Sequence, residues 1–322
     1  MAVYTHVSAE ALADFLTRFD VGELVSAKGI AEGVENSNYL VDTTKGRFIL
    51  TLYEKRVDSG DLPFFMALLD HLADKGLPVP PAIKDRQGNE IQQLAERTAC
   101  LIKFLPGVSL THPTAAQAFA AGEALGQLHM AVADFTGFRE NSMGQPNWQA
   151  LYEQCGTSLD TIAPGLHRDL GLAIGDLAAT FDRGGLDRCA IHADLFPDNV
   201  LMLGDRVTGL IDFYFACNDI RLYDLAVMHT AWSFDATGRQ HDAAVGAALI
   251  EGYSRHFPLN DDEHSAFNDL AVGACIRFTL SRAWDWLNTP ADALVTRKDP
   301  LSFWRRVRVY DPNLATLLPT LQ

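Results

Sequence analysis

The stretch Ile-His-Ala-Asp-Leu-Phe-Pro-Asp-Asn at residues 191–199 decides the fold of this chain. It places an acid, Asp194, five residues before an amide, Asn199, and a second acid, Asp212, follows within a later apolar run. Between them, two apolar runs flank a Gly-Asp pair at 204–205, which is the pattern of a β-hairpin with a two-residue turn. The motif is therefore a loop that leads into a hairpin, with one polar residue just before its first strand and another just after its second.

Counting outward from this turn places Asn199 opposite Leu210, so that Asn199 and Asp212 share the open end of the hairpin, diagonally across the two strands, with about 7–8 Å between their backbones. Amide and carboxylate oxygens suit Mg²⁺, which completes its octahedral shell with water or phosphate oxygens. Asp194 lies just upstream, where it can orient a substrate hydroxyl and accept its proton. We therefore expect a phosphoryl-transfer site with Asp194 as the catalytic residue; the alternative is a loop cap and two ordinary polar residues at the end of a hairpin.

The region before this motif mixes short strands with helices. Apolar spacing and an N-cap at Ser8 predict a helix over 8–19, and a proline near the first turn predicts another over 63–75. Alternating apolar runs between Gly and Asn residues predict strands over 23–26, 38–42 and 48–53, with further strands on both sides of a turn at 87–89. We expect residues 1–104 to form a small N-terminal nucleotide-binding lobe.

The periodicity after Pro106 is helical except for the hairpin, and predicts an α+β fold with two lobes. Residues 105–322 are expected to form the larger helical catalytic and substrate lobe, and such an architecture commonly holds a ligand between its parts. The predicted helices cover residues 113–133, 147–155, 165–183, 222–232, 240–255, 261–288 and 301–317.

The charge balance excludes several classes of partner. With 26 Lys and Arg against 41 Asp and Glu in 322 residues, the formal charge is −15, and no basic run is present. Such a surface repels nucleic acid and anionic membranes, so we expect neither as a partner. The five cysteines form no CxxC pair, the first twenty residues lack a signal-peptide pattern, and no apolar run is long enough to span a membrane. We expect a cytoplasmic protein; its oligomeric state is left open.

Two segments are candidates for contact with a nucleotide. The Gly- and Asn-rich stretch at 25–39 resembles a loop whose backbone N–H groups approach phosphates, with an ordinary hairpin turn as the alternative. A second segment, 100–107, has the character of a hinge whose backbone groups hold the edge of adenine, with a plain linker as the alternative. The predicted nucleotide-binding residues are Gly29, Gly33, Asn36, Ser37, Lys103 and Leu105.

Nearly the whole chain resembles the aminoglycoside phosphotransferase and choline kinase family of small-molecule kinases, and within it most closely the bacterial homoserine kinases. The resemblance implies a protein-kinase-like two-lobe fold, the use of ATP and Mg²⁺, and phosphorylation of the side-chain hydroxyl of L-homoserine in threonine biosynthesis. Another small-molecule alcohol kinase, for choline, aminoglycosides or sugars, and a nucleotide-binding pseudokinase module are the alternatives. The matching segments are ENSNY at 35–39, FILTLYE at 48–54, LPVP at 77–80, FLPG at 104–107, HADLFPDN at 192–199, DFY at 212–214, YDLA at 223–226 and RFTLSR at 277–282.

The chain departs from the family at one functional position. Kinases of this fold usually carry a Lys or Arg on the third strand, paired with a Glu on the next helix, but the strand position is Thr51 here and residues 62–75 contain no Glu. Loss of both partners avoids the unpaired buried charge that a single loss would leave. We expect Mg²⁺ and loop N–H groups to hold more of the phosphate charge, with help from Lys28 or Lys55.

Residues around the motif are assigned supporting or substrate-binding roles. His192 and Asp224 are expected to hold the backbone of the catalytic loop rather than to do chemistry. A free amino acid needs a cation for its carboxylate and an acid for its ammonium, and the helix at 261–288 supplies both types. The predicted substrate-binding residues are Asp198, Arg277, Arg282 and Asp285, with mutual pairing of Arg282 and Asp285 or an ordinary charged helix surface as the alternatives.

Overall fold

A five-stranded antiparallel sheet forms the N-terminal part of the computed structural model, which describes residues 5–30, 36–54, 58, 60–181, 185–289 and 297–321. Leu50 and Leu52 point to one face of the sheet and Thr51 and Tyr53 to the other, as the twofold repeat of a strand requires. In the order in which they pair, the strands are β1 (Leu24–Gly29), β2 (Asn36–Thr43), β3 (Gly46–Tyr53), β5 (Arg97–Lys103) and β4 (Gln92–Leu94).

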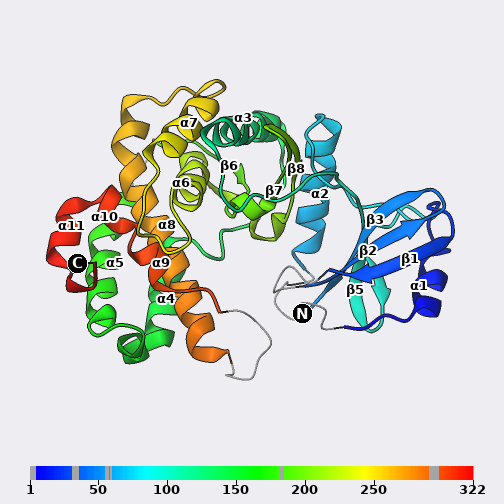
Figure 1. Ribbon diagram of the computed structural model, residues 1–322, viewed down its shortest axis with the longest axis horizontal. Coiled ribbons are helices and arrows are strands. Elements are labelled where there is room, and N and C mark those ends of the chain that lie inside the picture. Colours follow the sequence, from blue (N-terminus) through cyan, green and yellow to red (C-terminus); the bar gives the residue numbers. More distant parts are fainter. Residues whose placement is uncertain are drawn as a thin grey trace.

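Different helices cover the two faces of this sheet. Helix α1 (Ala9–Leu16), capped by the Ser8 hydroxyl, packs with the Leu50 face into a separate small core. Helix α2 (Leu62–Asp74) covers the Tyr53 face, and its side chains continue into the core of the helical part. Accordingly, α2 lies between the sheet and the helices in Figure 1. The sheet is thus joined to the rest of the chain by packing as well as by the connecting segment.

The remaining chain is mainly helical and forms the other end of the molecule (Figure 1). Its centre is α8, which packs against α4, α5, α6 and α9. The predicted α+β class and the two-part arrangement agree with this architecture, whereas the proposed boundary at residue 104 stays a prediction. The helices are α3 (Ala115–Ala131), α4 (Gln145–Cys155), α5 (Leu166–Phe181), α6 (Arg221–Trp232), α7 (Ala243–Ser254), α8 (Asp261–Asn288), α9 (Leu301–Trp304), α10 (Val307–Tyr310) and α11 (Pro312–Leu317).

Helices α3 and α7 approach until their backbones touch, and two glycines make this possible. A Cβ added to Gly122 would lie 2.1 Å from the carbonyl oxygen of Leu249, and one added to Gly252 would lie 2.0 Å from that of Phe119. No side chain fits at either position. The contact brings Tyr253 of α7 next to α3.

The hairpin after the candidate loop is present, but its register differs from our expectation. Strands β7 (Val200–Leu203) and β8 (Arg206–Leu210) pair antiparallel around the predicted turn. A bulge shifts the pairing by one residue, so Val200, not Asn199, faces Leu210. A second antiparallel pair, β6 (Arg188–Ile191) with β9 (Cys217–Ile220), was not predicted. This pair joins the strand that precedes the loop 191–199 to the strand that precedes α6.

Two further expectations about secondary structure are wrong. Residues 77–91 contain no regular strand, only an isolated bridge at Ala82, because Pro78, Pro80 and Pro81 lack the N–H groups that a strand needs. The helix expected over 301–317 is broken into three short ones, the last of which begins at Pro312.

No helix in the described part of the chain combines the length and the apolar character needed to cross a bilayer.

Candidate active site

The loop 191–199 connects β6 to β7, and its backbone is fixed by a carboxylate beneath it. Asp224 of α6 accepts hydrogen bonds from the backbone N–H of His192 at 2.7 Å and of Ala193 at 2.8 Å. These bonds hold Ala193 in a left-handed conformation, with φ of 63°, that residues other than glycine rarely adopt. Strained backbone of this kind persists where surrounding contacts enforce it. The predicted supporting role of Asp224 agrees with this geometry.

Asp224 is itself part of a buried polar network. The ring of His129 in α3 contacts its carboxylate at 3.1 Å and the Tyr253 hydroxyl at 3.0 Å, and Arg221 donates to that hydroxyl at 2.9 Å. Burial opposes ionisation of Asp224, but hydrogen bonds from His129 and from the His192 backbone hold its pKa below the usual value. The backbone of the loop is therefore bound by an ionised carboxylate, Asp224, that also has a side-chain partner in His129.

His192 links the loop to the hairpin. Its Nε2 donates to the carbonyl oxygen of Ile211 at 3.0 Å, and its Nδ1 accepts from the backbone N–H of Asp194 at 3.3 Å. This pattern requires a neutral ring, and burial lowers the pKa of His192, which agrees with neutrality. The side chain is fully buried, so it positions Asp194 and does not contact a ligand.

Asn199 and Asp212 lie at the open end of the hairpin. The backbone N–H of Ile211 donates to the carbonyl oxygen of Asn199 at 3.0 Å, which puts Asp212 one residue beyond the paired position. The amide nitrogen of Asn199 donates to the backbone oxygen of Asp194 at 2.8 Å, so its side-chain oxygen points away from that bond. Asp212 has a left-handed φ of 66°. The two left-handed residues of the site are thus Ala193, which precedes Asp194, and Asp212 itself.

This donor set fits a hard divalent ion. An amide oxygen and a carboxylate are oxygen ligands of the kind that Mg²⁺ selects, and phosphate or water oxygens supply the rest of its shell. Asp212 raises the pKa of Asp194, so the two carboxylates lie close enough to repel each other. Over the described residues, no cluster of three or more His, Cys, Asp or Glu side chains forms a metal cage. An ion held here would therefore need oxygens from its ligand.

Asp194 lies in an environment that makes its carboxylate a stronger base. Burial raises its pKa to about 8; the charge of Arg277 opposes the shift, and the charges of Asp212 and Asp198 add to it. Asn199 contacts the side chain at 3.4 Å. A base whose pKa lies near the working pH is suited to accept a proton from an alcohol.

The predicted substrate-binding residues do not all face the same space. Arg277, expected to bind the acceptor, is 2% exposed and donates to the Ala193 backbone oxygen, so it braces the loop instead. Asp198 is exposed beside the loop. Arg282 and Asp285 are partly buried on α8, and no ion pair joins them. Of the two predicted cations, only Arg282 retains an accessible surface.

The predicted nucleotide-binding residues lie along the sheet and the connecting segment. Gly29 ends β1, whereas Gly33 falls outside the described residues, as does Lys55. Asn36 accepts a hydrogen bond from the backbone N–H of Glu54, and the Ser37 hydroxyl donates to the Glu54 carboxylate at 2.8 Å. Because these side chains are engaged within the sheet, a phosphate contact from this segment would use its backbone N–H groups.

The connecting segment follows Lys103, whose backbone N–H donates to the carbonyl oxygen of Pro81 at 3.1 Å. The side chain of Leu105 lies next to Gly209 of the hairpin. Gly107, with φ of 151°, lets the chain pass close to Leu201. Lys103 thus ends the sheet and Leu105 lies against the hairpin, and their contact with adenine stays a prediction.

The position of the missing lysine is filled by a neutral cluster. The Thr51 hydroxyl donates to the Asn38 side chain at 2.8 Å. Beside it, the hydroxyls of Tyr53 and Tyr214 lie 3.2 Å apart, and the ring of Phe65 from α2 packs edge-on against Tyr214 at 5.8 Å. The cluster joins β3, α2 and the segment after Asp212. In other kinases an ion pair joins the third strand to the following helix.

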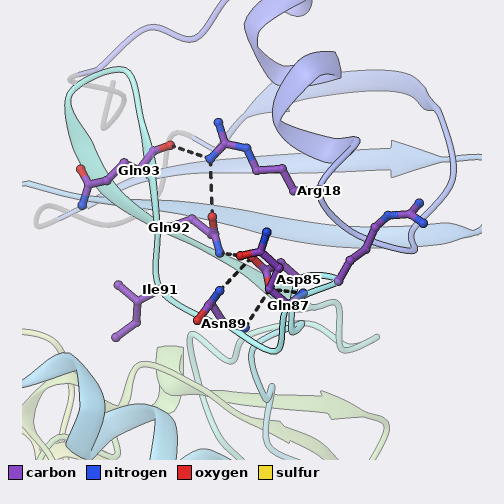
Figure 2. A pocket seen from close by; sticks show the side chains of 8 residues that line it. Arg18, Asp85, Gln87, Asn89, Ile91, Gln92 and Gln93 are labelled. Carbon is purple, nitrogen blue, oxygen red and sulfur yellow. Dashed lines mark hydrogen bonds between the residues drawn. The ribbon is translucent and has the colours of Figure 1, made fainter.

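The larger of the two cavities described lies away from the loop. It has a volume of about 520 Å³ and opens beside the segment 85–93, with Arg18, two residues after α1, above it (Figure 2). The carboxylate of Asp85 accepts hydrogen bonds from Gln87, Asn89 and Gln92. The acid of this cavity is thus satisfied by neighbouring residues, and none of the predicted site residues lines it.

Several supporting residues were not identified in the sequence. His129 and Tyr253 are far from the motif, and the contacts that give them and Tyr214 a role connect residues 95 to 161 positions apart. The DFY segment contains Tyr214, and the YDLA segment contains Asp224, but neither pattern indicated these contacts.

Comparison with known proteins places this site in a family. The model of the phosphotransferase enzyme family matches residues 26–259. The chain is 50% identical to a homoserine kinase of Zymomonas mobilis subsp. mobilis over 96% of its length and 97% of that protein, and 47% identical to one of Gluconobacter oxydans over 96% and 98%.

Solved structures agree on the fold. An amicoumacin kinase in complex with AMP-PNP, Ca²⁺ and Ami superposes with a TM-score of 0.72 at 14% identity, covering 96% of this chain and 94% of that one. A choline kinase from Cryptosporidium parvum gives a TM-score of 0.68 at 14% identity, covering 94% of each chain. The fold is therefore protein-kinase-like, as expected, and the chain belongs to the phosphotransferase enzyme family.

Proposed function

We propose that this kinase transfers the γ-phosphoryl group of ATP to the side-chain hydroxyl of L-homoserine, giving ADP and O-phospho-L-homoserine. The observation that carries the proposal is the near-50% identity, over almost the full length of both chains, to proteins named homoserine kinase. The acid, amide and acid gathered around one loop supply groups suited to that chemistry.

In the proposed reaction, Asp194 accepts a hydrogen bond from the substrate hydroxyl and directs its oxygen at the γ-phosphorus. A bond forms from that oxygen to phosphorus as the bond to the β-phosphate oxygen breaks, and the hydroxyl proton passes to Asp194. Asn199 and Asp212 would hold Mg²⁺, which when bound neutralises charge on the phosphate oxygens. His192, Asp224 and Arg277 keep the loop in the strained conformation that aims Asp194.

Adenine would lie by Lys103 and Leu105, and the phosphates beneath the segment between β1 and β2. With no lysine at Thr51, the ligand's charge would be met by backbone N–H groups and the ion. L-Homoserine is the proposed small-molecule partner of the site.

A coupled assay of ADP release tests the proposal. We expect turnover with L-homoserine and Mg-ATP to exceed that with choline, an aminoglycoside or a sugar. Asp194→Asn, which keeps the shape of the side chain, should abolish transfer while leaving the affinity for an ATP analogue within about threefold. Turnover with another alcohol but not with homoserine would refute the assignment of substrate. An Asp194→Asn variant that complements a homoserine-kinase-deficient strain would favour a regulatory module over an enzyme.

A further inference from the structure

Three arginines from the C-terminal part of the chain, Arg277, Arg282 and Arg306, lie wholly or partly in the interior, and two of them are held by backbone oxygens. Arg277 bonds the oxygen of Ala193, and Arg306 donates to the oxygen of Thr230 at 2.5 Å; they are 2% and 4% exposed. The third, Arg282 of α8, is only partly buried and donates from Nη1 to the Ser302 hydroxyl at 2.7 Å. Within the described residues, no carboxylate forms an ion pair with it.

An aromatic wall places Arg282 next to the loop. Phe196, two residues after Asp194, lies 4.9 Å from Phe278 of α8 and 5.7 Å from Phe303 of α9, measured between ring centres. The guanidinium of Arg282 stacks on Phe303 at 4.5 Å, one turn along α8 from Phe278. The Phe303 ring fixes the plane of the guanidinium, and the hydrogen bond to the Ser302 hydroxyl fixes the position of its Nη1.

The electrostatic environment of Arg282 is unfavourable in the absence of an anion. Burial and the neighbouring Arg306, which stacks on Phe303 at 3.9 Å, lower the pKa of Arg282 to about 10. The charges of Asp194, Asp299 and Asp198 act in the opposite direction, so all three lie near Arg282. None of them forms an ion pair with Arg282 among the described residues, and a carboxylate ligand would add a counter-charge in direct contact.

Arg277 is a weaker candidate for an anion. It borders a cavity of about 210 Å³ next to α4, but its guanidinium lies between Phe215 and Phe278 and already braces Ala193. Arg282 keeps Nε and Nη2 on the edge opposite Ser302, and that edge matches the two oxygens of a carboxylate.

We propose that Arg282 binds the α-carboxylate of the acceptor and thereby selects an amino-acid alcohol over neutral or cationic alcohols. This deepens the proposed function and rests on it, because the same substrate must present its hydroxyl to Asp194. Arg282 is then a residue of the acceptor site that determines specificity, and Ser302 and Phe303 are positioning residues behind it.

The test compares L-homoserine with 3-amino-1-propanol, which lacks the carboxylate, at saturating Mg-ATP. For Arg282→Ala, we expect kcat/KM with homoserine to fall roughly 100-fold, mainly through KM, because a buried charged hydrogen-bond partner is lost. With 3-amino-1-propanol, kcat/KM should stay within about threefold of wild type, as should the KM for ATP. Arg282→Lys, which keeps the charge but not the two-pronged geometry, should recover part of the loss.

The matched control is Arg255→Ala on α7, whose side chain is 62% exposed and stacks on Phe119, and which should leave both acceptors unaffected. Equal losses with both acceptors would overturn the proposal, because Arg282 would then act on the phosphate or the loop. An unchanged KM for homoserine would overturn it as well. Absence of homoserine turnover in the wild-type enzyme would instead refute the proposed function, and this assignment with it.

Discussion

Replacing Asp224 with Asn tests whether the catalytic loop depends on a buried charge. The carboxylate accepts two backbone hydrogen bonds, from His192 and Ala193, and contacts the ring of His129. Hydrogen bonds to a charged group are worth about 1.5–3 kcal/mol each, and an amide has only one oxygen to accept them. We therefore expect the free energy of unfolding to fall by about 3 kcal/mol. Because Ala193 would lose the contact that holds its left-handed conformation, kcat should fall by roughly 100-fold.

Urea unfolding followed by circular dichroism gives the stability, and the ADP-release assay gives kcat, both for the same preparation. The control is Asp134→Asn, which removes an exposed carboxylate that pairs with Lys75 and should change neither quantity measurably. If Asp224→Asn unfolds at the wild-type urea concentration with the wild-type kcat, the loop does not rest on this charge. A loss of stability with unchanged kcat would mean that the strain at Ala193 is unrelated to catalysis.

Three further substitutions test other contacts. Burial lowers the pKa of His229 from 6.5 to about 4, so on acidification the unfolded chain binds this proton before the folded chain does. The free energy of unfolding should therefore fall by on the order of 3 kcal/mol between pH 6.5 and 4. In urea melts at several pH values, His229→Gln should remove this contribution to the pH dependence of stability. Tyr214→Phe breaks the hydroxyl contact with Tyr53 and should cost about 1 kcal/mol in thermal unfolding while raising the KM for ATP; an unchanged KM would separate this cluster from nucleotide binding. Gly252→Ala forces a methyl group against the Phe119 carbonyl and should destabilise the chain by about 3 kcal/mol or more, whereas Gly175→Ala, on an open helix surface, should not.

The motif at 191–199 allowed the fold to be predicted from sequence, whereas the roles assigned to Asp194, Asn199 and Asp212 stay predictions. Spacing along a hairpin is a local property, so the position of Asn199 and Asp212 at one end of the hairpin followed from the turn alone. The register was wrong by one residue because a bulge adds a residue to β8 without a clear sequence signal. Both residues are still at the same end of the hairpin, and Asp212 is one position, rather than two, beyond the residue that faces Asn199.

What could not be predicted depends on contacts between distant residues. The pairing of β6 with β9 joins segments about 29 positions apart, and residues 217–220 are too polar to indicate a strand. Arg277 carried the charge expected of a substrate-binding residue, but only the packing of α8 against the loop shows that its guanidinium faces Ala193. Charge patterns on a helix identify cations, whereas tertiary packing decides which of them a ligand can reach.

The neutral cluster of Thr51, Tyr53, Tyr214 and Phe65 bears on how this enzyme is controlled. Protein kinases are switched off when the helix after the third strand swings outward and its Glu leaves the lysine. Here α2 carries no such Glu and is anchored in the same core as the large lobe, so its outward movement would expose apolar side chains without breaking any ion pair. A switch that breaks an ion pair between β3 and α2 is therefore not available to Thr51 and the residues of α2.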